Sequence, residues 1–226
     1  MRINRLTEAE HARVTEAVRA AEHGTDGEIV TIVTARSDAY HDVALHYAIG
    51  AMLLVVALAA LFPAALEAKI AWFSGGWAGE PQLGRSFFAL MLIEAIVFLI
   101  VRYTLAWAPL RMALTPGATR SRRVRRRAVE YFKVGAERRT AARVGILLYL
   151  SLDEHRAEIV ADEAIHGKVP AERWGDAMAA LVDEVRAGRP GEGMAAAVGH
   201  VGAILAETFP KSETDTNELP DRLIEL

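Results

Sequence analysis

The stretch VGILLYLSLDEHRAEIVA, residues 144–161, has the pattern of two strands joined by a tight turn. Residues 144–151 are mainly apolar, which favours a strand. The polar run at residues 153–156 is typical of a turn, and residues 157–161 return to mostly apolar side chains. The stretch therefore predicts a β-hairpin.

The elements on either side of this β-hairpin are mostly helices. Thr7 and Glu10 have the spacing of a capping box, so a helix is predicted to begin there and to end at Gly24. The short, β-branched run at residues 27–34 predicts another strand. Further helices are predicted over residues 122–133, from Pro170 onward, and over residues 194–209.

Two long apolar runs lie between the first strand and the basic helix. Residues 47–66 contain no acid, lysine, arginine or histidine. At about 1.5 Å per residue, a helix of this length crosses a hydrocarbon core of roughly 30 Å. A second run at about residues 86–108 has a similar length and carries Glu94 and Arg102. The sequence therefore predicts a two-helix transmembrane hairpin.

The predicted fold class is α/β, a small three-layer sandwich with a short β-sheet flanked by helices and the transmembrane hairpin inserted after the first strand. Residues 1–40 are predicted to form the first part of the sandwich, and residues 113–210 the second part. The hairpin occupies residues 41–112 between them. Residues 211–226 are predicted to be an acidic carboxy-terminal tail that can dock or recruit a partner.

Positive charge is concentrated after the second apolar run. Residues 102–143 hold 12 Lys and Arg against 2 Asp and Glu, whereas residues 144–226 hold 7 against 16. Basic residues flanking a span favour the cytoplasmic side, so both termini are predicted to lie in the cytoplasm of a bacterial-type inner membrane. Lipid contact adds on the order of 1 kcal/mol per cation near anionic headgroups. The six arginines of this basic juxtamembrane segment are Arg120, Arg122, Arg123, Arg125, Arg126 and Arg127.

Two other interpretations of these arginines stay open. A basic helix with Tyr131 and Phe132 could bind nucleic acid, but the membrane already accounts for the charge and the rest of the chain is acidic. The basic helix could also dock against the acidic carboxy-terminal part. In either case the apolar positions share one helical face, which predicts that the arginines form a solvated or lipid-facing stripe.

Glu94 and Arg102 are the ionisable residues of the second apolar run. An acid inside a membrane is a candidate functional residue. Proton or ion translocation would need a partner group, and neither run offers one near Glu94. The simpler interpretation is a glutamate bonded to a backbone group or to a second copy of the hairpin, which would make a homo-oligomer. Arg102 lies near the cytoplasmic end and can extend to the headgroups.

Three segments together resemble the TPM domain, the family of thylakoid-lumen, photosystem-repair and receptor-modulator proteins. They are TDGEIVTIV (25–33), AVEYFKVGAERRTAARVGILLYLSLDEHRAEIVADEAI (128–165) and RAGRPGEGMAAAVGHVGAIL (186–205). The resemblance covers both soluble pieces. It implies divergent roles, because some members are acid phosphatases or calcium binders and others are accessory factors of membrane complexes. The best-known members work outside the cytoplasm behind a signal peptide, whereas the pattern of this sequence does not predict one.

The same resemblance indicates a candidate cation site. Glu28 matches the family's glutamate at the start of the first strand, and Asp162 falls where the family tends to place an acid. Two carboxylates at one sheet edge could hold calcium or magnesium, which prefer oxygen ligands. Competing interpretations are structural: Glu154 and His155 lie in a turn, and Glu163 with His166 gives only one copy of a metal-type spacing.

Two functions follow from these patterns. The first is a membrane-anchored TPM-like module that is not an enzyme and binds a protein partner whose identity the sequence does not give. The alternative is a calcium- or magnesium-dependent phosphatase or related hydrolase. The chain has no cysteine, which excludes thiolate catalysis, and it has no phosphate-binding loop or serine-hydrolase motif.

Overall fold

The computed structural model describes residues 5–73, 83–135, 144–212 and 221–226. The chain divides into two compact units. Residues 1–38 and 117–226 form one unit, called here the sheet domain, and residues 39–116 form the other, called here the helical hairpin. Each unit is described separately.

A four-stranded mixed sheet organises the sheet domain, in the order β3-β2-β1-β4. β1 (Glu28–Thr34) pairs in parallel with β2 (Gly145–Ser151), and β2 pairs antiparallel with β3 (Arg156–Ala161). The β-hairpin predicted from residues 144–161 is therefore confirmed. All residues of β1 and β2 are buried, because these strands are central and both of their faces are covered.

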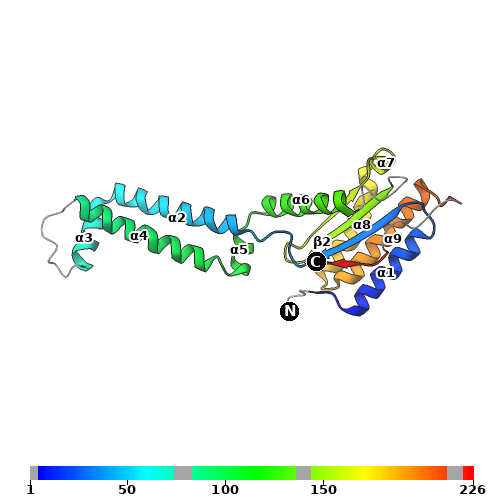
Figure 1. Ribbon diagram of the computed structural model, residues 1–226, viewed down its shortest axis with the longest axis horizontal. Coiled ribbons are helices and arrows are strands. Elements are labelled where there is room, and N and C mark those ends of the chain that lie inside the picture. The colour runs from blue at the N-terminus through cyan, green and yellow to red at the C-terminus, as the bar shows by residue number, and fades with distance from the viewer. Residues whose placement is uncertain (1–4, 74–82, 136–143, 213–220) are drawn as a thin grey trace. The chain divides into compact units, whose positions relative to one another are not determined.

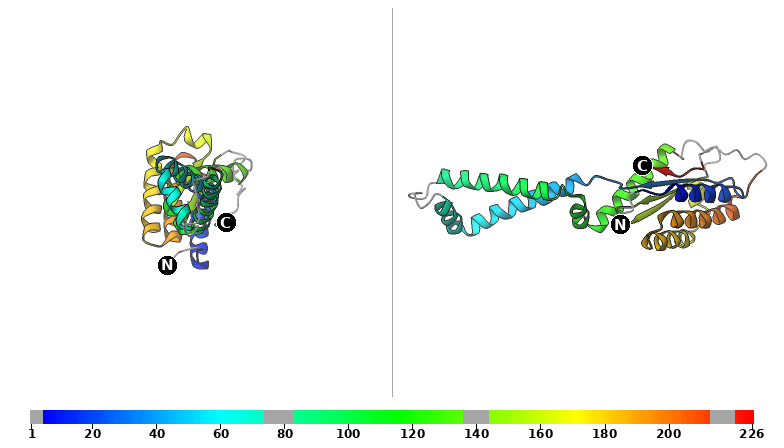
Figure 2. Two further views of the ribbon diagram at one scale, coloured as in Figure 1. Left: turned by 90° about the vertical axis from the view of Figure 1, so that its left-hand side faces the viewer. Right: turned by 90° about the horizontal axis from the view of Figure 1, so that it is seen from below.

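Helices cover both faces of the sheet (Figures 1 and 2). On one face, α1 (Glu8–Glu22), α8 (Trp174–Arg186) and α9 (Pro190–Thr208) enclose the larger core, to which β2 contributes Ile146, Leu148 and Leu150. On the other face, α6 (Gly117–Gly135) packs Val124, Ala128 and Phe132 against Leu147 and Tyr149 of β2. Alternate residues of β2 thus enter different cores, which explains its continuous apolar sequence. The predicted α/β class with a sheet flanked by helices is confirmed.

Short elements link β3 to the large core. Asp162 follows β3 directly and precedes α7 (Glu163–His166), whose Ile165 is fully buried. The 3₁₀ turn η1 (Ala171–Arg173) then leads into α8. The helix expected from Pro170 therefore begins as a 3₁₀ turn and becomes α-helical at Trp174.

The carboxy-terminal residues belong to the sheet domain. The sequence predicts residues 211–226 as a tail, whereas the structure shows β4 (Ile224–Glu225) paired in parallel with β1. Leu226 N donates to Val33 O at 3.0 Å, and Leu223 is buried in the larger core. The tail interpretation failed here because a two-residue strand has too little sequence to show a periodic pattern. Residues 213–220 lie outside the described residues.

The helical hairpin contains α2 (His41–Leu61), α3 (Pro63–Phe73), α4 (Leu83–Thr104) and α5 (Ala108–Leu114). α2 and α4 lie side by side (Figure 1), and both are long and apolar enough to cross a membrane. The first run was expected at residues 47–66, but α2 begins at His41 and ends before Pro63, which starts a separate helix. Residues 74–82, part of the expected connecting loop, lie outside the described residues.

Candidate functional site

The segment Arg36–Ser37–Asp38, called here the exit segment, is the last part of the sheet domain before the chain enters the helical hairpin. It is held first by the β2–β3 turn. Arg36 donates from Nε and Nη2 to Asp153 Oδ2, at 2.9 and 2.7 Å. Glu154 Oε1 accepts from Ser37 N at 2.9 Å. The turn therefore fixes the backbone as it leaves β1.

Glu154 is buried, with only 2% of its surface exposed. Its second carboxylate oxygen accepts a hydrogen bond from Ser151 Oγ. Ser37 Oγ and Tyr149 OH share a further hydrogen bond of 2.9 Å, and burial raises the pKa of Tyr149 to about 12. Glu154 could not be told apart from its polar neighbours by sequence, because a turn of four polar residues does not reveal which one points inward.

Helix α6 holds the exit segment from the other side. Arg127 Nε donates to Ser37 O at 3.2 Å. Arg123 and Arg126 form ion pairs with Asp38 at 3.2 and 3.3 Å. Arginines of the basic segment therefore contribute to the domain's internal structure, a role that the predicted solvated stripe did not include.

The outward side of α6 carries the remaining positive charge. Arg125 and Arg126 have 74% and 63% of their side-chain surface exposed. Arg125 Nη1 lies 3.6 Å from Glu158 Oε2 of β3. The neighbouring acid on the helix, Glu130, pairs with Arg126 and Arg127. Arg120 is half-buried, and its Nε has no hydrogen-bond partner among the described residues. A hollow of about 440 Å³, called here the basic face, is lined by Arg122, Arg125, Arg126, Val129, Glu130 and Lys133.

The two carboxylates of the expected cation site do lie at the same edge of the sheet. Glu28 pairs with Gly145 across β1 and β2, and Asp162 exchanges two hydrogen bonds with Gly145. Asp162 Oδ2 accepts from Gly145 N at 2.8 Å, so this carboxylate caps the first residue of β2. Both acids are buried. The parallel pairing of β1 with β2 and the antiparallel return of β3 place both acids next to Gly145.

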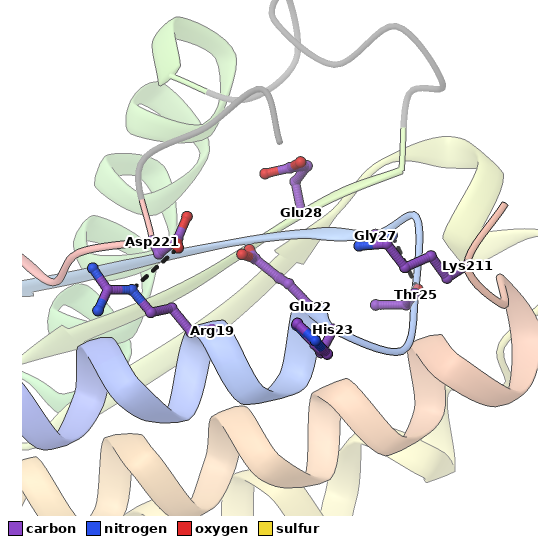
Figure 3. A pocket seen from close by; sticks show the side chains of 8 residues that line it. All are labelled: Arg19, Glu22, His23, Thr25, Gly27, Glu28, Lys211 and Asp221. Atoms are coloured by element: carbon purple, nitrogen blue, oxygen red, sulfur yellow. Dashed lines mark hydrogen bonds and ion pairs between the residues drawn. The ribbon is translucent and has the colours of Figure 1, made fainter. Parts of the chain in front are cut away.

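A cavity of about 310 Å³ opens beside Glu28 (Figure 3). Glu22 and Asp221 also line it, but Glu22 Oε1 accepts from Ile29 N at 2.8 Å and Asp221 pairs with Arg19 at 3.4 Å. Asp162 is not among its lining residues. Calcium takes about six to eight oxygen ligands. Within the described part of the chain, no three histidine or acidic side chains come together to hold a metal ion. The described acids therefore do not form such a cluster by themselves, and a calcium or magnesium site at Glu28 and Asp162 stays a prediction.

In the helical hairpin, Glu94 lies on the side of α4 that is partly covered, and Arg102 lies in its last turn. The structure adds Arg111, which the sequence analysis did not single out. Arg111 is buried and donates from Nη1 to Leu105 O at 2.9 Å and to Ala106 O at 3.3 Å. A cation bonded to carbonyls just beyond a helix end stabilises that end.

Comparisons with known proteins agree with the fold. Residues 110–204 match the family model described as the TPM domain, which confirms the resemblance over this region. The match begins within α5 and ends before β4, so it does not test the insertion of the helical hairpin. A solved structure, the BA42 protein of the psychrophilic bacterium Bizionia argentinensis, is similar with a TM-score of 0.55 and 17% identity. The alignment covers 98% of this chain and 95% of that one. A search of curated proteins finds no match.

Proposed function

We propose that this chain is a membrane-anchored TPM-domain protein whose sheet domain acts as an interaction or accessory module, without catalysis, at the cytoplasmic face of a bacterial-type inner membrane. One observation carries the proposal. Helix α6, which follows the two apolar helices and the short α5, holds the sheet with one side and presents the basic face with the other.

The connections between the two units are short. Only Ala39 and Tyr40 separate the exit segment from α2, and Tyr40 is fully buried beside Val43 and Met112. On the return path, Thr115 and Pro116 alone separate α5 from α6. With an anchored hairpin, connections of this length would keep the sheet domain close to the headgroups.

Electrostatics supports a contact between the basic face and anionic lipid. Arg122, Arg125, Arg126 and Lys133 line the basic face, and Glu130 is the one acid among its lining residues. Cations near an anionic surface gain about 1 kcal/mol each. The sheet domain would then be oriented on the membrane, with α1, α8 and α9 directed to a protein partner.

One assay distinguishes the proposed module from the competing function, a calcium- or magnesium-dependent hydrolase. The purified full-length protein is incubated with a generic phosphomonoester and either cation, beside the Asp162→Asn variant. Asn keeps an acceptor for Gly145 N, so the variant should stay folded. We expect no cation-dependent phosphate release. Turnover that Asp162→Asn loses while its melting temperature is unchanged would overturn the proposal of a module without catalysis.

A further inference from the structure

Glu94 is the only acid in α4, and it lies well inside the helix. Its Oε1 is buried and has no hydrogen-bond partner among the residues that the structure describes. Glu94 belongs to the partly covered positions of α4, which recur in pairs such as Ile93–Glu94 and Val97–Phe98. A buried carboxyl oxygen without a partner is costly anywhere, and the cost is several kcal/mol in hydrocarbon.

The described residues of the helical hairpin do not satisfy this carboxyl group from within one chain. The covered positions of α2 all carry apolar side chains, so none of them can donate a hydrogen bond to Glu94. Backbone groups in the middle of α2 and α4 are used by the helices themselves. The covered positions of α2 are Val43, Ala44, Ala48, Ala51, Met52, Val55 and Ala59.

Glu94 is also at the margin of the covered side, because the next residue, Ala95, is exposed. Met91 precedes Glu94 by about one helical turn and therefore projects from the same side of α4. The exposed fraction of Met91 is 56%. Ile96 is exposed to the same 56%, but it lies about 200° around the helix from Glu94 and therefore projects from the opposite side. One stripe of α4 thus combines exposed apolar side chains with a carboxyl group that lacks a partner.

We propose that α4 associates with α4 of a second copy of this chain, and that the two Glu94 carboxyl groups hydrogen-bond to each other across a two-fold axis. Each neutral carboxyl group donates its O–H to the other and accepts one in return. A two-fold axis places the same residue on both sides of an interface. The inference rests on the proposed function, because only a membrane makes water an unavailable partner for Glu94.

The chain has no cysteine, so single-cysteine cross-linking tests the pair without background. Met91→Cys in the full-length protein, oxidised in native membranes, should give a disulfide-linked dimer. Ile96→Cys is the matched control and should give at least tenfold less. Equal cross-linking at the two positions would contradict a defined α4 interface.

The role of the carboxyl group is tested in the Met91→Cys background. Glu94→Leu removes both hydrogen bonds and should lower the dimer fraction in dilute detergent roughly tenfold, from typical interhelical hydrogen-bond strengths. Glu94→Gln keeps a donor and an acceptor on each side and should retain most of the dimer. A dimer that Glu94→Leu leaves unchanged would refute the pair.

Labelling with a membrane-impermeant maleimide distinguishes a failure of the Glu94 pair from a failure of the membrane anchoring on which it rests. Met91→Cys should resist the reagent on both sides of the membrane and react after detergent is added. Resistance without any dimer would refute only the Glu94 pair. Rapid labelling in intact membranes would show that α4 is not in hydrocarbon, and both proposals would fail.

Discussion

Ser37 N donates to Glu154 Oε1 at 2.9 Å, joining the middle of the exit segment to the turn between β2 and β3. The two residues are 117 positions apart, and both are buried. The hydrogen bond closes a polar cluster that also contains Ser151 and Tyr149. The point at which the chain leaves the sheet domain is therefore internally fixed.

Glu154→Ala should destabilise the sheet domain by about 1–3 kcal/mol, because Ser37 N and Ser151 Oγ would stay buried without their acceptor. Thermal unfolding of the full-length protein in detergent measures the loss. Glu163→Ala is the matched control, since Glu163 is an exposed acid in α7. Similar melting temperatures for the two variants would contradict the role given to Glu154.

Burial of Tyr149 predicts a loss of stability at high pH. Its folded pKa is about 12, above the ordinary value of 10, so the folded state keeps the proton that the unfolded state releases. The resulting contribution to the free energy of unfolding is complete below pH 10. It is lost as the pH rises toward 12, by at most about 1.4 kcal/mol per pH unit.

The unfolding free energy measured between pH 9 and pH 11.5 tests this dependence. Tyr149→Phe removes the titrating group and should show a shallower decline than the original protein. Parallel curves for the two proteins would mean that Tyr149 titrates normally.

Close packing of α9 on α1 depends on Gly202. A Cβ at this position would lie 2.5 Å from Ala21 Cβ, so Gly202→Ala should cost about 1–3 kcal/mol of stability through overpacking. Gly199 is on the same helix, with no atom within 4 Å of an added Cβ. Gly199→Ala should therefore be neutral or stabilising by up to about 1 kcal/mol. Chemical denaturation of both variants compares the two directly.

The residues around the two-residue strand β4 should contribute to stability. Leu223→Ala removes a side chain buried in the larger core, and the expected cost is about 2–5 kcal/mol. Leu226→Ala serves as the control, because its side chain is exposed while its backbone bond to Val33 is kept. A melting temperature unchanged by Leu223→Ala would show that the carboxy terminus is an independent tail after all.

The β-hairpin, the layered α/β class and the two apolar helices could be predicted from the sequence, because each has a strong local pattern. The continuous apolar run that forms the buried strand β2 and the capping box at Thr7 are examples. The sequence was insufficient for contacts between distant segments. Asp38 and Glu154 became recognisable only when β1, β2 and α6 were placed together, and their own neighbours in the sequence carry no periodic signal.

The basic face should respond to lipid charge. An environment-sensitive fluorophore on Val129→Cys should shift to shorter wavelength in vesicles with anionic lipid, and this shift should disappear with purely zwitterionic lipid. High salt should also reduce it, because the screening length is only about 3 Å at 1 M. The same fluorophore on Ala196→Cys of α9, an exposed position in the opposite layer, should not respond. Equal shifts at both positions would contradict an oriented domain.

The side of the membrane on which the sheet domain lies is best measured with one exposed cysteine, Ala196→Cys, in the full-length protein. The account predicts that an impermeant maleimide leaves this cysteine unlabelled in intact spheroplasts and labels it in inverted vesicles. Labelling in spheroplasts would place the sheet domain outside the cytoplasm. It would then contradict both the orientation inferred from the arginines of α6 and the proposed function.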